Sequence, residues 1–428
     1  MDIKKNKIAV IGLGYVGLPL AIRCIEKGYS VIGLDLDQKK LTAIANRKSP
    51  FKEEFIEERL DLLEKLEASN DASKLVEADI ILICVPTPVD EQFYPNLNPV
   101  KGAIKMCIEN RKPGQLIVVE STINPGVCEE VVEPMLAKAG LDEGKDYFLA
   151  HCPERIDPGN EKWNVTNIPR VVGSLSVKGA EIAQKFYASI IDGEVRVMKS
   201  IREAEATKVV ENSFRDINIA FVNELAKSFD QMDIDVKDVI LGAATKPFAF
   251  MPHFPGRGVG GHCIPVDPYY LIEQAKKKGF DHHFLRVARE INNSMPNYTV
   301  ELMQDLLNNA KLPMKGIKIG VMGLSYKANI DDLRESPAVK IIKELEKKKA
   351  SIVSFDPYIL DMSDVKTVDE FLEEVQAVIF VTNHKEFMKI TPEKFKENGV
   401  VAIVDGMNAL DGEKIKSLGM EDHGIGRS

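Results

Sequence analysis

The sequence has few cysteines, a single tryptophan and no long apolar run. Its six cysteines, at 24, 84, 107, 128, 152 and 263, form no CxxC pair and no metal-type spacing, which argues against a disulfide framework and a zinc site. Most of them are expected to be small buried hydrophobic residues. Apolar stretches such as 80–85 and 117–119 have the length of strands and are too short to span a membrane. We therefore expect no bound metal and no membrane partner.

The chain also lacks an excess of positive charge. Its 428 residues include 56 Lys and Arg against 65 Asp and Glu, a formal net charge of −9, so nucleic acid is not an expected partner. A small anionic ligand remains compatible with this charge, because local donors hold such a ligand. The first apolar run breaks at Gly12 and is too short for a signal peptide, so we expect a cytoplasmic protein.

The hydrophobic pattern changes twice along the chain. From residue 8 to about 191, short β-branched runs alternate with amphipathic stretches, and this pattern resumes after Pro313. Such alternation predicts a parallel sheet with helices on both faces in each region. Between these regions, Ser200 and Glu203 fit a capping box at a helix N-terminus. Beyond it, apolar residues recur every three or four positions from Val210 to Met232, which predicts one long amphipathic helix.

These patterns predict an α/β protein in which two doubly wound, Rossmann-like domains are joined by a central, mostly helical region. The length fits two to four domains at about 100 to 200 residues each, and we expect three. Their predicted bounds are 1–199, 200–312 and 313–428. The polar tail, residues 412–428, is expected to fray.

A glycine-rich turn follows the first predicted strand. Gly12, Gly14 and Gly17 form a GxGxxG pattern that opens a helix, which is typical of a loop that holds a pyrophosphate at a helix N-terminus. Asp35 ends the second predicted strand, 23 residues after Gly12. A carboxylate there accepts the ribose hydroxyls and repels a 2′-phosphate, so the pattern predicts NAD rather than NADP.

A second motif, at 260–267, carries a thiol. Cys263 lies in a glycine-rich loop, and Asp267 follows four residues later. A cysteine in a random position is usually inert packing, but here the flanking glycines and the nearby acid favour covalent capture of an aldehyde, with the carboxylate holding a water.

Three weaker signals point to chemistry. Lys208 and Asn212 are four residues apart on the long helix, so both point the same way and could donate to an oxyanion, although a solvated face is the commoner explanation. Glu154 follows a strand at the end where such sheets bind ligands, and is equally compatible with a surface role. In the last region, Lys327 and Arg334 follow a Gly323 turn and could hold a second phosphate-bearing ligand.

The order of these motifs, with VPTP at 85–88, EST at 120–122, PER at 153–155 and SYKANIDDLRES at 325–336, resembles the UDP-glucose/GDP-mannose 6-dehydrogenases along nearly the whole chain. The resemblance implies an NAD-dependent, four-electron oxidation of the C6 alcohol of a UDP-sugar to the uronic acid. The implied intermediates are a thiohemiacetal and then a thioester on one cysteine.

The resemblance also assigns roles to residues. Cys263 matches the nucleophile, Lys208 and Asn212 the oxyanion donors, and Asp267 with Thr122 the groups around the water. Glu154 matches a carboxylate of thioester hydrolysis. Lys327 lies near the junction of cofactor and sugar, and Arg334 helps to orient it or the cofactor site. The residues implied to bind NAD are Gly12, Gly14, Gly17, Asp35, Thr87 and Thr122.

Family members use the central helices to dimerise, so a homodimer is implied, and they often lend a basic residue to the partner's site. Arg257 and Lys246 are candidates for that residue. The stretches 153–174 and 247–271 resemble the UDP-N-acetylglucosamine 6-dehydrogenases and favour that substrate. Cys152, and Arg257 where relatives commonly have Pro, depart from the pattern, so UDP-N-acetylmannosamine and UDP-glucose remain alternatives.

Two other functions share part of the pattern. A single-step NAD-dependent hydroxyacid dehydrogenase would need neither a nucleotide-binding third domain nor Cys263. An NAD-sensing regulator without catalysis would leave Lys208, Asn212 and Cys263 without a common site.

Overall fold

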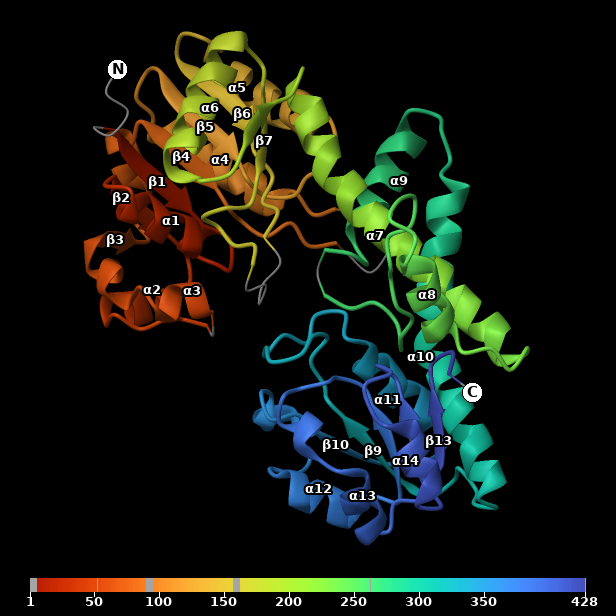
Figure 1. The fold of residues 1–428 in the computed structure, drawn as a ribbon. Helices are drawn as coiled ribbons and strands as arrows, with labels where there is room; N and C mark the ends of the chain where they lie inside the picture. The colour runs from red at the N-terminus through yellow and green to blue at the C-terminus, as the bar shows by residue number, and fades with distance from the viewer. Residues whose placement is uncertain (1–5, 52, 90–94, 157–161, 262, 428) are drawn as a thin grey trace. The chain divides into compact units, whose positions relative to one another are not determined.

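The computed structural model describes residues 6–51, 53–89, 95–156, 162–261 and 263–427, which fall into two compact units (Figure 1). Unit 1 consists of residues 1–211 and 269–280, and unit 2 of residues 212–268 and 281–428. His262 of the predicted cysteine motif lies outside the described residues.

Unit 1 is built on an eight-stranded sheet in the order β3-β2-β1-β4-β5-β6-β7-β8. Its strand pairs are parallel except for β6 with β7, which run antiparallel. The central strands are buried along their whole length, because helices cover both faces of the sheet. The strands are β1 (Lys7–Ile11), β2 (Ser30–Leu34), β3 (Leu66–Ser69), β4 (Ile80–Ile83), β5 (Gln115–Val119), β6 (Tyr147–His151), β7 (Arg170–Ser174) and β8 (Val195–Val197).

The helices of unit 1 bury one apolar core on each face of this sheet. Leu18 and Ala21 of one helix and Phe186 of another belong to the first core, and Val100 and Leu136 belong to the second. The helices are α1 (Gly17–Glu26), α2 (Gln38–Ala45), α3 (Glu54–Glu57), α4 (Asn98–Glu109), α5 (Glu133–Lys138) and α6 (Val177–Ile190).

Unit 2 contains a second, five-stranded sheet in the order β10-β9-β11-β12-β13, parallel throughout. It too has an apolar core on each face. Its strands are β9 (Lys318–Met322), β10 (Ser351–Phe355), β11 (Ala377–Phe380), β12 (Ala402–Asp405) and β13 (Glu421–Gly424). Its helices are α8 (Val236–Ala244), α10 (His283–Asn309), α11 (Pro337–Lys347), α12 (Val368–Glu374), α13 (Pro392–Glu397) and α14 (Gly412–Ser417).

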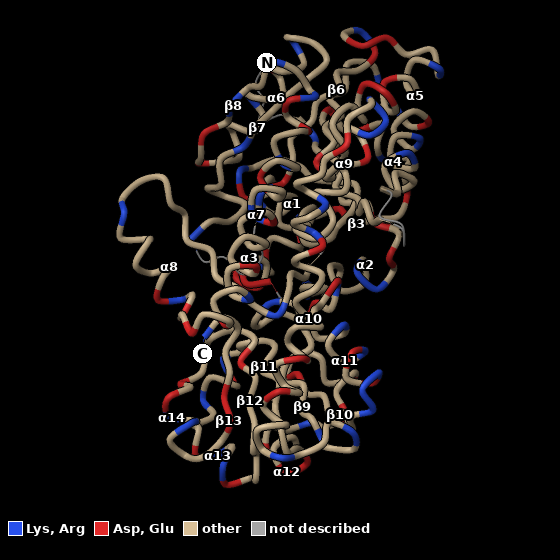
Figure 2. Tube along the Cα trace, turned by 90° about the vertical axis from the view of Figure 1, so that its right-hand side faces the viewer, with Lys and Arg blue, Asp and Glu red and all other residues tan. Residues whose placement is uncertain are grey.

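Two helices contribute residues to both units. The long helix α7 (Ile201–Asp230) has 30 residues, and α9 (Asp267–Lys277) begins directly after the cysteine motif. The predicted class is therefore confirmed: two doubly wound parallel sheets and a helical region with one long helix. Figure 2 shows Lys and Arg interspersed with Asp and Glu along the trace of each unit. No helix among the described residues is long and apolar enough to cross a membrane.

The expectation that the polar tail frays is wrong. Helix α14 and strand β13 order it, and β13 forms an edge of the second sheet by pairing with β12. Its polar groups have partners, because Arg427 donates to Asp422 at 3.1 Å and to the Leu410 carbonyl at 3.0 Å. The Gly426 carbonyl also accepts from the Val236 N–H at 2.9 Å.

A buried charge cluster lies in unit 1, where β5, β6 and β7 meet. The Arg170 guanidinium is fully buried and lies 3.4 Å from a Glu120 carboxylate oxygen and 2.6 Å from one of Glu154. The Tyr187 hydroxyl donates to the other oxygen of Glu120. Burial raises the pKa of Glu120 to about 7, and the neighbouring Glu154 charge acts in the same direction. The Arg170 charge acts to lower this pKa but is outweighed.

This pKa predicts a pH-dependent stability. The folded protein binds a proton on Glu120 more tightly than the unfolded chain does, because the pKa is raised from the ordinary value of 4.5. This difference contributes fully to the free energy of unfolding below pH 4.5, and the contribution is lost as the pH rises through about 7. Glu120→Gln should remove this loss, because the amide does not titrate. Unfolding by urea at several pH values measures it, with the exposed Glu57→Gln as control. Parallel pH profiles for wild type and Glu120→Gln would contradict this account.

Candidate active site

Three glycines shape the turn after β1, each under a different constraint. Gly12 has φ +96°, and a Cβ added to it would lie 2.6 Å from the Cys84 carbonyl oxygen. A Cβ on Gly17 would lie 1.8 Å from the Gly12 oxygen, whereas one on Gly14 would meet no atom within 4 Å. The turn is thus closed at Gly12 and Gly17 and open at Gly14, which fits the close approach of a dinucleotide pyrophosphate.

Asp35 lies beside this turn, at the end of β2. One carboxylate oxygen accepts from the Leu13 N–H at 2.8 Å and from Lys40 Nζ at 3.2 Å, and the other accepts from the Asp37 N–H at 2.8 Å. Burial acts to raise the pKa of Asp35, but these hydrogen bonds outweigh it and lower the pKa. An ionised carboxylate at this place fits the ribose of a dinucleotide.

Thr87 and Thr122 are joined directly. Thr87 Oγ1 donates to the Thr122 carbonyl at 2.8 Å, and the Thr87 carbonyl accepts from the buried Tyr270 hydroxyl. Asn124 Nδ2 in turn donates to the Tyr270 carbonyl at 2.9 Å. The two threonine loops are therefore fixed to one another and to α9 through Tyr270, a residue that the sequence analysis missed.

Glu154 is held as part of the buried cluster. It is 6% exposed, and its Oε1 accepts from the N–H groups of Arg155 at 2.5 Å and Ile156 at 2.6 Å. Arg170 contacts its other oxygen. These contacts exclude the surface alternative, and they fix the orientation of a carboxylate at the carboxyl end of β6.

Lys208, on α7, is 8% exposed, and within the described part of unit 1 no hydrogen bond or ion pair engages its ammonium group. One turn earlier, the buried Glu205 accepts from the N–H groups of Gly126 and Cys128, the latter at 2.8 Å. Glu205 thereby attaches the loop that follows Thr122 to the helix that carries Lys208.

In unit 2, Cys263 differs from every other cysteine of the chain. It is the one exposed thiol, whereas Cys24, Cys107, Cys128 and Cys152 are buried and Cys84 is half-buried. Burial raises the pKa of the Cys107 thiol to about 12, and it raises those of Cys24, Cys84, Cys128 and Cys152 as well. Cys263 is therefore the cysteine most accessible for nucleophilic chemistry.

The loop that carries Cys263 packs against the last sequence motif. A Cβ on Gly260 would lie 2.6 Å from Tyr326 Cβ, and one on Gly261 would lie 2.8 Å from the Tyr326 ring. The Gly261 N–H donates to the Arg334 carbonyl at 2.9 Å. Only glycine permits this approach, so the two motifs of unit 2 form one surface.

The polar groups around Cys263 include several of the predicted residues. Asn212 Nδ2 donates to the buried Asp267 at 2.5 Å, and the Asp267 N–H donates to the Cys263 carbonyl at 2.8 Å. Arg334 binds Asp332 through two nitrogens, and its pKa is raised first by that hydrogen bond and also by the Asp332, Tyr326 and Cys263 charges. Lys327 is half-buried, and its carbonyl accepts from Ser325 Oγ at 3.0 Å.

The turn after β9 repeats the turn after β1 but differs in its carboxylate. Gly323 has φ +98°, and Asp356 ends β10 as Asp35 ends β2. Asp356 is fully buried and accepts from the N–H groups of Leu324 at 2.7 Å and Ser325 at 2.9 Å. His384 Nε2 lies 3.0 Å from the same oxygen. Asp356 is therefore not accessible to a ribose.

The two candidates for a basic residue shared with a partner subunit lie in different surroundings. Lys246 is exposed, with its ammonium 4.7 Å from the centre of the Phe248 ring. Arg257 is only 7% exposed and lies inside unit 2, where it contacts the Tyr326 and Gly406 carbonyls. Arg257 is thus enclosed by its own unit, whereas Lys246 is exposed.

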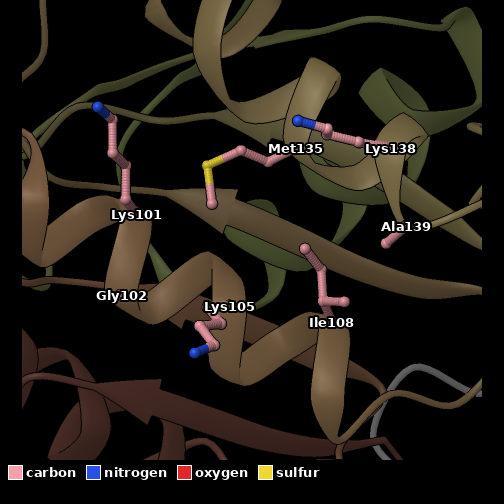
Figure 3. Close-up of a pocket in the computed structure, with 7 residues that line it drawn as sticks. All are labelled: Lys101, Gly102, Lys105, Ile108, Met135, Lys138 and Ala139. Carbon is pink, nitrogen blue, oxygen red and sulfur yellow. The ribbon is translucent and has the colours of Figure 1, made fainter.

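A shallow groove on unit 1 lies apart from these residues (Figure 3). It has a volume of about 490 Å³ and lies between α4 and α5. None of the predicted site residues lines it. Its lining residues are Lys101, Gly102, Lys105, Ile108, Met135, Lys138 and Ala139.

Comparison with known proteins assigns each part of the chain. Three models of the UDP-glucose/GDP-mannose dehydrogenase family match: the NAD binding domain at 6–191, the central domain at 202–294 and the UDP binding domain at 320–412. The UDP-N-acetyl-D-mannosamine dehydrogenase of Pyrococcus horikoshii is 35% identical over 425 residues, covering 98% of this chain and 99% of the relative. The UDP-N-acetyl-D-glucosamine 6-dehydrogenase of Salmonella typhi is 34% identical over 409 residues, covering 93% of this chain and 94% of the relative.

A solved structure of the P. horikoshii UDP-D-ManNAc dehydrogenase has a TM-score of 0.92 to this chain, at 34% identity, and covers 98% of this chain and 99% of that one. The match of a UDP binding domain to the second sheet removes the hydroxyacid dehydrogenase alternative, which predicted no such domain. The predicted resemblance and the predicted NAD cofactor are confirmed. The chain belongs to the UDP-glucose/GDP-mannose dehydrogenase family and is an NAD-dependent oxidoreductase.

Proposed function

We propose that this enzyme oxidises the C6 alcohol of a UDP-N-acetylhexosamine to the carboxylate in two successive steps, with Cys263 as the covalent nucleophile. The observation that carries the proposal is the exposure of this one thiol in a loop bound to the Tyr326–Arg334 segment of unit 2. An enzyme that stopped at the aldehyde would need no nucleophile, whereas oxidation to an acid requires one to regenerate an sp³ carbon.

The NAD-binding residues are proposed to be Gly12, Gly14, Gly17, Asp35, Thr87 and Thr122, with Lys327 and Arg334 at the junction with the sugar nucleotide. When bound, NAD would supply the redox chemistry as the hydride acceptor for both oxidations at C6, that of the alcohol and that of the thiohemiacetal. The protein's own groups bind the substrate, form and release the covalent bond and move the protons.

In the covalent step, Cys263 Sγ adds to the C6 aldehyde carbon and the carbonyl oxygen becomes an oxyanion. Lys208 Nζ and the Asn212 amide are the proposed donors to this oxyanion, and the absence of a described partner for Lys208 supports its role. Asn212 donates to Asp267, so this amide also fixes the carboxylate.

In the last step, a water attacks the thioester carbon, a proton leaves the water and the Cys263 thiolate is released. Asp267, with Thr122, is proposed to hold and deprotonate this water, and Glu154 to assist the hydrolysis. The buried position of Asp267 and the fixed orientation of Glu154 support these roles.

UDP-N-acetylglucosamine is the substrate favoured by the sequence motifs. UDP-N-acetylmannosamine is the second candidate, because the P. horikoshii relative that matches nearly the whole chain is named for it. We also propose a cytoplasmic enzyme with functional domains 1–199, 200–312 and 313–428, each of which contains one family match.

The covalent route predicts a stoichiometry. The enzyme is incubated separately with UDP-glucose, UDP-N-acetylglucosamine, UDP-N-acetylmannosamine and GDP-mannose. One of the two UDP-N-acetylhexosamines should be oxidised, and each molecule of it should give two NADH and one uronic acid, without free aldehyde. Cys263→Ala and Cys263→Ser should lower the rate by orders of magnitude while NAD still binds, because a nucleophile has been removed. The matched control is Cys107→Ala, which removes a buried thiol. Formation of one NADH per molecule of substrate, with an aldehyde as product, would contradict the proposal.

Asp35 predicts a preference for NAD over NADP. Asp35→Ala should relax this preference, because Lys40, 3.2 Å from the carboxylate, loses its partner and becomes available to a 2′-phosphate. The ratio of kcat/KM for the two cofactors measures the effect, and Asp35→Ala with Lys40→Met is the control that removes the new cation. Faster wild-type turnover with NADP would contradict the role of Asp35.

The apolar face of α7 predicts a homodimer. Val210, Phe214 and Phe221 recur at spacings of four and seven residues, so they share a face, and they are 54%, 48% and 53% exposed. Sedimentation at micromolar concentration should give a dimer, and Phe221→Asp should shift it to monomer. Glu413→Lys, an exposed change on α14, is the charge control. A fully active wild-type monomer would refute this assembly.

A further inference from the structure

Arg257 lies at the edge of the second sheet where parallel strands bind ligands. Its N–H donates to the Gly406 carbonyl at 3.2 Å, and its Nη2 donates to the Tyr326 carbonyl at 3.0 Å. Gly406 follows β12 and Tyr326 follows β9, so both contacts are at carboxyl ends of strands. In the sheet, β10 lies on one side of β9, and β11, the strand that follows β10 in the chain, lies on the other. Open α/β sheets bind ligands where the strand order reverses in this way.

The charge of Arg257 is uncompensated. The other buried arginines all have carboxylate partners: Arg23 binds Glu26 and Asp192, Arg170 binds Glu120 and Glu154, and Arg289 binds Asp216. Among the described residues Arg257 has no such partner, and its Nε is buried without a hydrogen bond. Burial alone lowers the pKa of Arg257 to about 10. A buried charge of this kind is costly unless an anion balances it.

The turn after β9, next to Arg257, has two of its backbone N–H groups engaged by a side chain. In a nucleotide-binding turn the backbone N–H groups usually face the phosphates. After β9, the N–H groups of both Leu324 and Ser325 donate to the buried Asp356 carboxylate, and after β1 the Leu13 N–H donates to Asp35. The engagement of two N–H groups in the second turn favours a side-chain donor for a phosphate at this edge, and a planar guanidinium is well suited to it.

We propose that Arg257 binds the diphosphate of the nucleotide sugar from within the same chain, at the carboxyl edge of the second sheet. This inference rests on the proposed UDP-sugar function. It adds a phosphate-binding side chain from outside the matched UDP binding domain, 320–412. Arg257 lies six residues before Cys263, so a diphosphate bound here also anchors the segment that leads to the nucleophile.

The test compares UDP with uridine, which lacks the phosphates, by calorimetry on the full-length enzyme. Arg257→Met should weaken UDP binding by roughly 10- to 100-fold, as expected for loss of a charge-assisted contact, and should leave uridine and NAD binding nearly unchanged. Arg257→Lys keeps the charge without the planar guanidinium, so its UDP affinity should lie between those of wild type and Arg257→Met. Lys315→Met removes an exposed charge from the same unit and should match wild type.

Unchanged UDP affinity in Arg257→Met, or an equal loss for UDP and uridine, would overturn the proposal and leave the dehydrogenase function standing. Failure of wild type to bind UDP would instead count against the UDP-sugar function itself. Thermal melts identify a variant that does not fold. In that case Arg257→Gln, whose amide can still donate to the Tyr326 carbonyl, replaces Arg257→Met, and the same UDP-to-uridine comparison decides.

Discussion

The hydrogen bond between the turn after a first strand and a carboxylate at the end of the second is the constraint on which both sheets depend. Leu13 donates to Asp35 in unit 1, and Leu324 donates to Asp356 in unit 2. In each case the bond fixes a glycine turn at the ligand edge of a parallel sheet. The two carboxylates differ in accessibility. The Asp35 side chain is partly exposed to solvent, whereas Asp356 is fully buried beside His384.

The same comparison explains why one fold takes two kinds of ligand. An accessible carboxylate near an open Gly14 leaves room for a ribose and a pyrophosphate. The buried Asp356 carboxylate is instead engaged by two backbone N–H groups and a histidine, so it is not available to a ligand. Tyr358 stacks on His384, with ring centres 4.8 Å apart.

The sequence predicted the class of fold and the local motifs, because both depend on short-range patterns. Strand alternation, the Gly12 turn and the exposed Cys263 loop are each set by a few neighbouring residues. Residues whose importance comes from distant partners were missed: Arg170 and Glu120 are 50 positions apart, and Tyr270 reaches Thr87 across 183. A charged residue beside an apolar strand was the available signal, but it did not identify the partner. The tail was misjudged for the same reason, since its polar groups are satisfied by residues far along the chain.

That tail also packs against helices that precede the second sheet in the chain. Val236 near the middle of the chain donates to the carbonyl of Gly426, and a Cβ on Gly426 would lie 2.7 Å from Ala226 Cβ. Helix α8 and the end of α7 therefore obtain part of their packing from the segment that also supplies the edge strand β13 of the second sheet. A substitution in this segment is expected to act on the helical region as well as on the sheet.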